Sequence, residues 1–264
     1  MNILKVLKNF FRKIGFEIKR SNITPYEYLK DKTRYRKMNI KLLGKDFLIS
    51  DSLSFYFSYK EIFIDEIYKF FTNSDNPKII DLGSNVGTSI IYFKKIYPNA
   101  KILGVEADPK IFEILNKNIS NFNFSGIKLF NKAITNTSCK SIKFYQEGAD
   151  GGRVYPIEGQ TFTEVDTETI DALISENIDL LKIDIEGSET DALLSSQKLN
   201  KVNNIFIEYH SFINDKQTLD KILGKLTDNG FRYIIHTQLA SKRPFIEKLE
   251  NMSMDLQLNI FATK

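Results

Sequence analysis

The chain is nearly devoid of cysteine: Cys139 is the only one among 264 residues. A single cysteine excludes an intrachain disulfide and any metal cluster built from cysteines, and it is typical of a protein kept in a reducing compartment. Long apolar runs are also missing, since none reaches the roughly 20 residues that a membrane-spanning helix needs. The N-terminus lacks the long apolar core and small-residue cleavage site of a signal peptide. We therefore expect a cytoplasmic protein.

The chain also lacks a large excess of positive or negative charge. The formal net charge is +4, with 42% hydrophobic and 27% charged residues, which is ordinary for a soluble globular protein. Such a small positive balance does not predict a nucleic-acid partner. The length allows one large domain or two small ones.

Residues 1–22 form the first predicted unit, a basic amphipathic helix. Its apolar residues recur at helical spacing, and lysines and arginines fill the remaining face with Glu17 as the only acid of residues 1–20. Such a helix either contacts an anionic membrane surface, here the inner face of the membrane, or packs against the main domain or a second subunit of a homo-oligomer. Apolar stripes usually mark packing, so we favour packing and leave peripheral membrane contact through residues 1–20 open.

Residues 23–76 form a predicted helix and hairpin subdomain. A threonine and a proline, typical of a helix start, predict a short helix over residues 25–38. Alternation over residues 40–49 around a glycine predicts a strand or hairpin. Apolar spacing over residues 61–71 predicts a second helix.

Residues 77–264 show alternating strand and helix patterns, which indicate an α/β domain. Strands are predicted over 78–82, 101–106, 127–134, 179–185, 203–209, 231–236 and 257–263, and helices over 86–97, 109–121, 188–197 and 215–229. Such alternation predicts a mostly parallel sheet with helices on both faces. No helix pattern separates the last two strands, so we expect an antiparallel pair at the sheet edge. An insertion over about residues 135–170 interrupts the pattern.

The segment Asp-Leu-Gly-Ser-Asn-Val-Gly at residues 81–87 is typical of a strand end, a glycine turn and a helix start. Glycines let a ligand approach the backbone, and the helix N-terminus offers free N–H groups. The next strand ends in Glu106, a carboxylate suited to both ribose hydroxyls of an adenosine. The alternative is that Asp81 and Glu106 only cap helices, but Asp108 is the better cap for the second helix. Together the two signals favour a nucleoside-cofactor site.

The glycine spacing distinguishes between cofactors. A dinucleotide fingerprint needs G-x-G-x-x-G, whereas counting from Gly83 the other two places hold Asn85 and Thr88. The observed Gly-x-x-x-Gly therefore favours S-adenosylmethionine, which has no phosphate, over a nicotinamide dinucleotide. Asp81 suits the positive groups of that cofactor.

A second polar segment covers residues 179–189. In the strand predicted there, Lys182, Asp184 and Glu186 share one face, and burying them without partners is costly. One interpretation is a satisfied Lys182–Asp184 pair, with Glu186 and Glu189 stabilising a helix N-terminus. The other is a catalytic cluster, which the position at the cofactor crevice favours.

The following strand brings Glu208 and His210 to the same edge. Asp184, Glu208 and His210 can then act as a general base with helpers or as a hard-metal site. Their spacing is no recognised metal signature, so a divalent metal is not favoured. A lone histidine is more often structural, so His210 carries less weight than Glu208.

These segments resemble the FkbM family of S-adenosylmethionine-dependent methyltransferases. The similarity covers roughly residues 55–210, and residues 182–187 (Lys-Ile-Asp-Ile-Glu-Gly) are its most specific part. It rests on residues 59–63, 68–70, 81–87, 104–109, 179–189 and 207–210.

The resemblance implies a class I methyltransferase fold. That fold is Rossmann-like, with a seven-stranded sheet, mostly parallel with the last strand antiparallel, here preceded by an N-terminal helical extension. It also implies O-methylation of a hydroxyl on a sugar, glycan or natural-product acceptor. The expected cofactor-binding residues are Glu61, Asp81, Gly83, Asn85, Gly87, Glu106 and Ala133. The expected catalytic residues are Asp184, Glu186, Glu208 and His210, and the expected substrate-binding residues are Lys182 and Arg153.

Three other functions stay open as alternatives. A nucleic-acid methyltransferase normally carries a Pro-Pro-aromatic motif or a catalytic cysteine, but residues 184–187 are Asp-Ile-Glu-Gly. A methyltransferase for a different small molecule fits the same motifs. A NAD-dependent oxidoreductase is disfavoured by the missing central glycine.

Overall fold

The computed structural model describes residues 25–137, 140–145, 162–213, 215–247 and 254–264. The helix predicted over residues 1–22, Arg153 and part of the insertion over residues 135–170 lie outside the described residues. None of the described helices is both long and apolar enough to cross a membrane.

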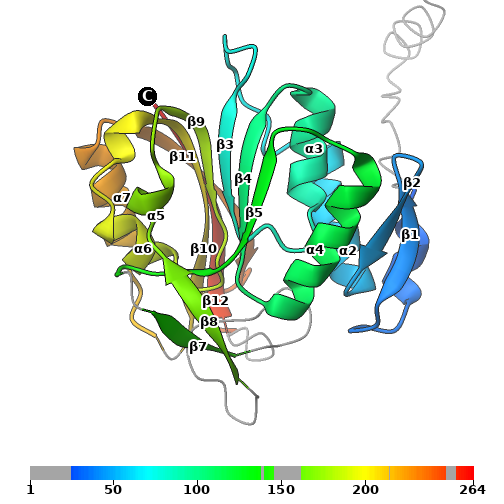
Figure 1. The fold of residues 1–264 in the computed structure, drawn as a ribbon. Helices are drawn as coiled ribbons and strands as arrows, with labels where there is room; N and C mark the ends of the chain where they lie inside the picture. The colour runs from blue at the N-terminus through cyan, green and yellow to red at the C-terminus, as the bar shows by residue number, and fades with distance from the viewer. Residues whose placement is uncertain (1–24, 138–139, 146–161, 214, 248–253) are drawn as a thin grey trace, which may run out of the picture.

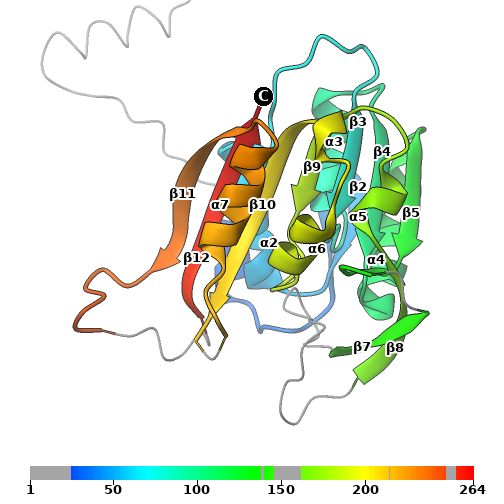
Figure 2. The same ribbon diagram turned by 90° about the vertical axis from the view of Figure 1, so that its left-hand side faces the viewer.

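A seven-stranded sheet with the strand order β11-β12-β10-β9-β3-β4-β5 forms the centre of the molecule (Figure 1). Its strands are β3 (Lys78–Leu82), β4 (Lys101–Glu106), β5 (Ile127–Asn131), β9 (Ile178–Ile183), β10 (Val202–Phe212), β11 (Arg232–Ala240) and β12 (Met254–Thr263). β12 is antiparallel to both of its neighbours, and the pairs among β10, β9, β3, β4 and β5 are parallel. The predicted seven-stranded, mostly parallel sheet with an antiparallel last strand is therefore confirmed. Figure 2 shows β12 between β10 and the edge strand β11.

Helices cover both faces of this sheet. α3 (Thr88–Ile96) and α4 (Pro109–Phe122) lie on one face, and α5 (Ile170–Leu173), α6 (Glu189–Ser195) and α7 (Leu219–Asp228) on the other. A short 3-10 turn, η3 (Leu199–Lys201), leads into β10. Each face has its own apolar core, because the strands are apolar on both sides as expected for a doubly covered sheet.

The chain leaves β3 toward β4 and β5 and later returns to place β9 on the other side of β3. This is a topological switch point, where the loops after neighbouring strands diverge and leave a crevice at the carboxyl ends. The crevice therefore opens beside the ends of β3 and β9.

The N-terminal hairpin was predicted correctly, but the helix over residues 25–38 was wrong. β1 (Met38–Leu42) and β2 (Lys45–Ile49) pair antiparallel through a two-residue turn. Within residues 25–37, the described part that precedes them, only η1 (Glu27–Asp31), a 3-10 turn, is helical. The side chain of Asp51 accepts hydrogen bonds from the Tyr35 backbone and the Arg34 guanidinium, and Tyr35 has a φ of 57°. This tertiary contact holds the chain out of the helical conformation.

The helix predicted over residues 61–71 was also wrong. Helical backbone begins at Ser52 and ends at Ile64. α2 (Ser52–Tyr59) starts after Asp51, whose side chain accepts from the Ser54 N–H at 2.9 Å, and continues as the π-helical η2 (Lys60–Ile64). Glu66, with a φ of 53°, lies beyond its end. After it, without helical backbone, Tyr68 is buried and Ile67 and Phe70 are partly buried in the core, whereas Phe71 is exposed.

The N-terminal elements pack on the main sheet through α4. The Asn118 side chain bonds both the N–H and the carbonyl of Leu48 in β2, at 2.7 and 2.8 Å. It also donates to the Val86 carbonyl at 2.8 Å. These bonds connect the hairpin, which precedes α2 in the chain, to the loop after β3.

The strand predicted over residues 127–134 is split. β5 stays in the main sheet, whereas β6 (Ala133–Ile134) joins β8 (Phe162–Glu168) and β7 (Ser141–Tyr145) in a three-stranded sheet of order β6-β8-β7. The chain turns at Lys132, whose N–H donates to the carbonyl of Glu106. The described part of the predicted insertion is this small sheet, placed at the carboxyl edge of the main one.

Candidate active site

A cavity of about 490 Å³ lies at the carboxyl ends of β3, β4 and β9. This volume lies within the range of roughly 300–1,000 Å³ that is typical of small-molecule sites. α2 and η2 form one wall, and β6 and the loop after β4 form another. The glycine turn after β3, the start of α3 and residues of β9, β10, β11 and β12 also line the cavity. The predicted site residues on its lining are Glu61, Gly83, Asn85, Glu106, Ala133, Lys182, Asp184, Glu186 and Glu208.

The glycine turn brings two loops into direct contact. Gly83 has a φ of +77°, and a Cβ added there would lie 1.7 Å from the carbonyl oxygen of Asp184. No L side chain fits that position, so the turn requires glycine. Gly87 was expected to face the cofactor, but it is absent from the cavity lining. A Cβ there would lie 2.9 Å from Leu115 Cδ1, so Gly87 allows α3 and α4 to pack closely.

Glu106 is held in place by two backbone N–H groups. Its carboxylate accepts from Asn85 at 2.8 Å and from Asp108 at 2.9 Å. Asp108 caps α4, as predicted, because its side chain accepts a hydrogen bond from the backbone N–H of Lys110 at 2.8 Å. Burial raises the pKa of Glu106 to about 7, although the two backbone bonds oppose the shift. Glu106 is therefore fixed at the cavity wall and is not used to cap a helix.

Asp81 and Lys182 form a buried ion pair beneath the glycine turn. Asp81 was expected to contact the cofactor, but it is fully buried, is absent from the lining, and accepts from Ser89 Oγ at 2.6 Å. Lys182 Nζ lies 3.1 Å from Asp81 and 3.3 Å from Asp184, and donates to the carbonyls of Gly83 and Leu82. Burial alone would lower the pKa of Lys182, but the two aspartates outweigh it and raise this pKa.

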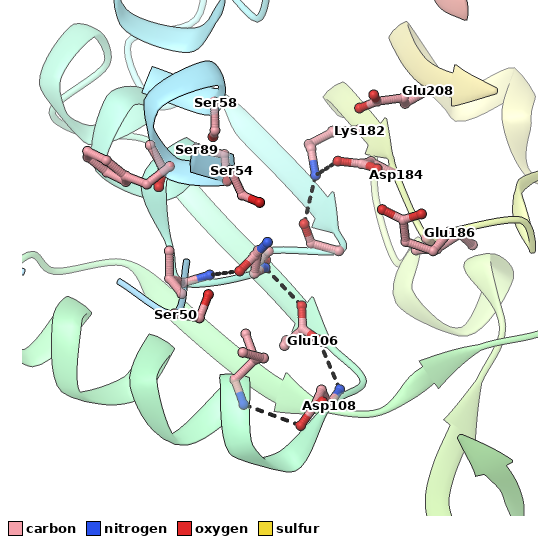
Figure 3. Close-up of a pocket in the computed structure, with 18 of the residues that line it drawn as sticks. Ser50, Ser54, Ser58, Ser89, Glu106, Asp108, Lys182, Asp184, Glu186 and Glu208 are labelled. Atoms are coloured by element: carbon pink, nitrogen blue, oxygen red, sulfur yellow. Dashed lines mark hydrogen bonds and ion pairs between the residues drawn. The ribbon is translucent and has the colours of Figure 1, made fainter. Parts of the chain in front are cut away.

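Three acids gather on one side of the cavity, away from Glu106 (Figure 3). They are Asp184, Glu186 and Glu208. Burial and the neighbouring charge of Asp184 raise the pKa of Glu208 well above its usual value, and Gln257 donates a hydrogen bond to it. Glu61 lies on the lining as well, accepts from Gln238 at 2.7 Å, and has a pKa raised by burial.

His210 does not line this cavity, which corrects its expected place among the reacting groups. It borders a smaller hollow of about 220 Å³ behind the acids. Its Nδ1 lies 3.0 Å from Glu189 and its Nε2 lies 3.6 Å from Glu186. Burial disfavours the imidazolium, but these two carboxylates outweigh it and raise the pKa of His210 well above its usual value.

The group considered as a metal site does converge. One ligand atom each from Asp184, Glu208 and His210 lie within 4.8 Å of one another. Oxygen and imidazole ligands suit a divalent cation in type. Two basic side chains lie beside this group of acids, with Lys182 3.3 Å from Asp184 and His210 3.6 Å from Glu186.

Sequence reasoning missed three parts of the site. The α2 wall adds Ser50, Ser54, Phe57 and Ser58, and the edge strands add Gln238, Leu239 and Gln257. Glu189 was considered only as a helix-stabilising acid. The one available signal was the Asp51-Ser52-Leu53-Ser54 sequence, a helix-start pattern that would have placed α2 correctly.

Comparison with known proteins gives consistent family matches. The family model described as "Methyltransferase FkbM domain" matches residues 81–233, more than half of the chain. "Methyltransferase sdnD" of Sordaria araneosa is 27% identical over 205 residues, covering 60% of this chain and 79% of that protein. "Methyltransferase 1" of Beauveria bassiana is 26% identical over 179 residues, covering 58% and 72%.

Solved structures with a similar fold include a methyltransferase FkbM from Methylobacillus flagellatus. It has 19% sequence identity and a TM-score of 0.49 to this chain. The match covers 76% of this chain and 47%, about half, of the M. flagellatus chain. The M. jannaschii TYW2 complex with AdoMet has 13% identity and a TM-score of 0.47, with 88% and 89% coverage. The match of the family model over residues 81–233 assigns the chain: it belongs to the FkbM family of S-adenosylmethionine-dependent methyltransferases.

Proposed function

We propose that the enzyme transfers a methyl group from S-adenosylmethionine to a hydroxyl of a sugar, glycan or natural-product acceptor. The observation that carries this proposal is the cluster of three carboxylates on the cavity lining opposite Glu106. A hydroxyl must lose its proton when it is methylated, and a carboxylate on the lining is a suitable proton acceptor.

The residues of the lining fit the cofactor. Glu106, fixed by two N–H groups, is placed to accept the ribose hydroxyls, as carboxylates at this position do in related folds. Gly83, Asn85 and Ala133 lie on the same lining. When bound, S-adenosylmethionine supplies a methyl group on a positively charged sulfur.

Glu208 is our proposed general base. Its pKa is raised well above the usual value by burial and by Asp184, and a raised pKa makes a carboxylate a better proton acceptor near neutral pH. Asp184 is held by Lys182 at 3.3 Å, so we assign it the orientation of the acceptor. Glu186 lies on the lining beside them.

The α2 wall supports a hydroxyl-rich acceptor. Ser54 and Ser58 place hydroxyl groups on the lining across from the acids, and Phe57 adds a half-exposed ring at 50% exposure. A few polar groups beside an apolar surface are typical of a site that orients a small ligand.

A methyl-transfer assay with labelled cofactor tests the proposal. We expect transfer to at least one member of a panel of sugars, glycans and natural-product alcohols, and none to RNA or DNA oligonucleotides. Glu208→Gln should lower turnover by about 100-fold or more, the usual effect of removing a general base, with cofactor affinity unchanged. Glu113→Gln, an exposed position on α4 outside the cavity lining, is the matched control. Wild-type turnover in Glu208→Gln and Asp184→Asn would reject the assignment.

A further inference from the structure

Glu189 is an acid buried behind the cavity that the proposed reaction does not use directly. It is the first residue of α6, and its side chain is 1% exposed. Its carboxylate accepts from the backbone N–H groups of Ile185 and Gly187, between 3.0 and 3.2 Å. The same carboxylate contacts His210 Nδ1 at 3.0 Å. A buried carboxylate with this many hydrogen-bond partners is held in a fixed position.

The imidazole of His210 is held on several sides. Glu189 from α6 contacts Nδ1, and Glu186 from the preceding loop lies 3.6 Å from Nε2. Phe212 stacks on the ring with an interplanar angle of 12°. Gln257 of β12 lies 3.4 Å from Nε2 and donates to Glu208. His210 therefore connects the buried Glu189 to the two acids of the cavity lining.

We propose that Glu189 is a positioning residue for methyl transfer, which holds His210 as a fixed positive charge beside Glu186 and Glu208. This inference rests on the proposed function, because it gives Glu208 the role of general base. Glu189 contacts the lining directly at the backbone N–H of Ile185, and it reaches the lining acids Glu186 and Glu208 through His210.

These contacts make the pKa of Glu208 depend on Glu189, which acts on it through His210. Asp184 and Glu186 raise the pKa of Glu208 beyond the effect of burial, and His210 lowers it. The other titratable groups bordering His210 in the smaller hollow are Asp191, Asp215 and Lys216. If Glu189 loses its charge, His210 loses a partner that favours its imidazolium form. Glu208 then binds its proton more tightly and becomes a base only at higher pH.

The variant Glu189→Gln keeps the shape and a carbonyl acceptor for the loop N–H groups but removes the charge. We expect the acidic limb of the kcat/KM profile to move up by about one pH unit, a tenfold loss at any pH on that limb. His210→Gln should produce the same shift, and the double variant should add little to either, because the two residues act as one unit.

Asp171→Asn is the matched structural control. Asp171 also braces a loop, accepting from the N–H groups of Gln197 and Lys198 and from Ser196 Oγ, but it is not among the residues lining the cavity. It should cost stability without moving the pH profile. If Glu189→Gln lowers turnover equally at every pH, as a merely structural change would, the proposal is overturned.

A second readout is independent of methyl transfer. The chain has two histidines, His210 and His236, so NMR of the imidazole carbons can follow His210 separately. We expect His210 to stay protonated through neutral pH in the wild type and to titrate at clearly lower pH in Glu189→Gln. Identical His210 titrations in the two proteins would refute the role of Glu189. Failure of the wild type to methylate any hydroxyl acceptor would instead refute the proposed function.

Discussion

Replacing Lys182 by methionine tests whether the residue supports the cofactor loop or binds the acceptor. The ammonium is buried and has four acceptors, the carboxylates of Asp81 and Asp184 and the carbonyls of Leu82 and Gly83. An ammonium has three N–H donors, so these acceptors leave none for a substrate. We therefore predict that Lys182→Met acts mainly on folding stability.

The magnitude follows from what the substitution leaves behind. Asp81 is fully buried, and its Oδ1 has no hydrogen-bond donor beyond the ion pair with Lys182. Removing one partner of a buried ion pair costs about 3–5 kcal/mol, because the remaining charge is uncompensated. Lys94→Met is the matched control, since Lys94 is 3% exposed and, among the described residues, its ammonium bonds two carbonyls, of Pro98 and Ala100, and no carboxylate. Its loss should cost no more than about 2 kcal/mol.

Urea unfolding followed by circular dichroism measures both variants, since the chain has no tryptophan for fluorescence. We expect the free energy of unfolding to fall more for Lys182→Met than for Lys94→Met, and cofactor affinity to fall with it because Gly83 loses its brace. A Lys182→Met protein as stable as the wild type, with only a higher KM for the acceptor, would refute this reasoning and make Lys182 a substrate residue.

Other predictions follow from the same site. Gly83→Ala should abolish cofactor binding and lower the melting temperature, because its Cβ would lie 1.7 Å from a backbone oxygen; calorimetry and thermal unfolding measure this, and normal binding would contradict the turn geometry. The wild-type affinity for S-adenosylmethionine should fall as pH drops below about 7, the pKa of Glu106, because the ionised carboxylate accepts both ribose hydroxyls. Glu106→Gln should bind about 10–100-fold more weakly at pH 8, the loss expected for charge-assisted hydrogen bonds, and should lose that pH dependence. Treatment with a chelator should leave turnover unchanged, since Lys182 and His210 already neighbour the acids; complete loss restored by a divalent ion would reveal a metal site.

The central fold was predictable because its signals are local and strong. β3, β4 and β9 are short apolar runs that end in polar residues or glycine, and α4 has both a capping aspartate and a proline at its start. Such patterns depend on neighbours in the sequence. The cofactor-side residues Gly83, Asn85 and Glu106 follow from those elements, and all three line the cavity.

The errors occur where distant contacts decide the structure. The helix predicted over residues 25–38 was lost to bonds from Asp51, a residue outside it. Asp81 was assigned to the cofactor from its place at a strand end, but it is buried against Lys182, which lies in a strand 101 residues later. The pairing of Glu189 with His210 likewise joins two elements that no local pattern relates. Sequence periodicity carries no information on such pairs.

Cofactor binding is the most direct test of the account. Isothermal titration of the purified chain with S-adenosylmethionine, its demethylated product and NAD compares the three ligands at one pH. We predict saturable binding of S-adenosylmethionine and its demethylated product, weakened by Glu106→Gln and unchanged by Glu113→Gln. Tight binding of NAD with no binding of S-adenosylmethionine would contradict it.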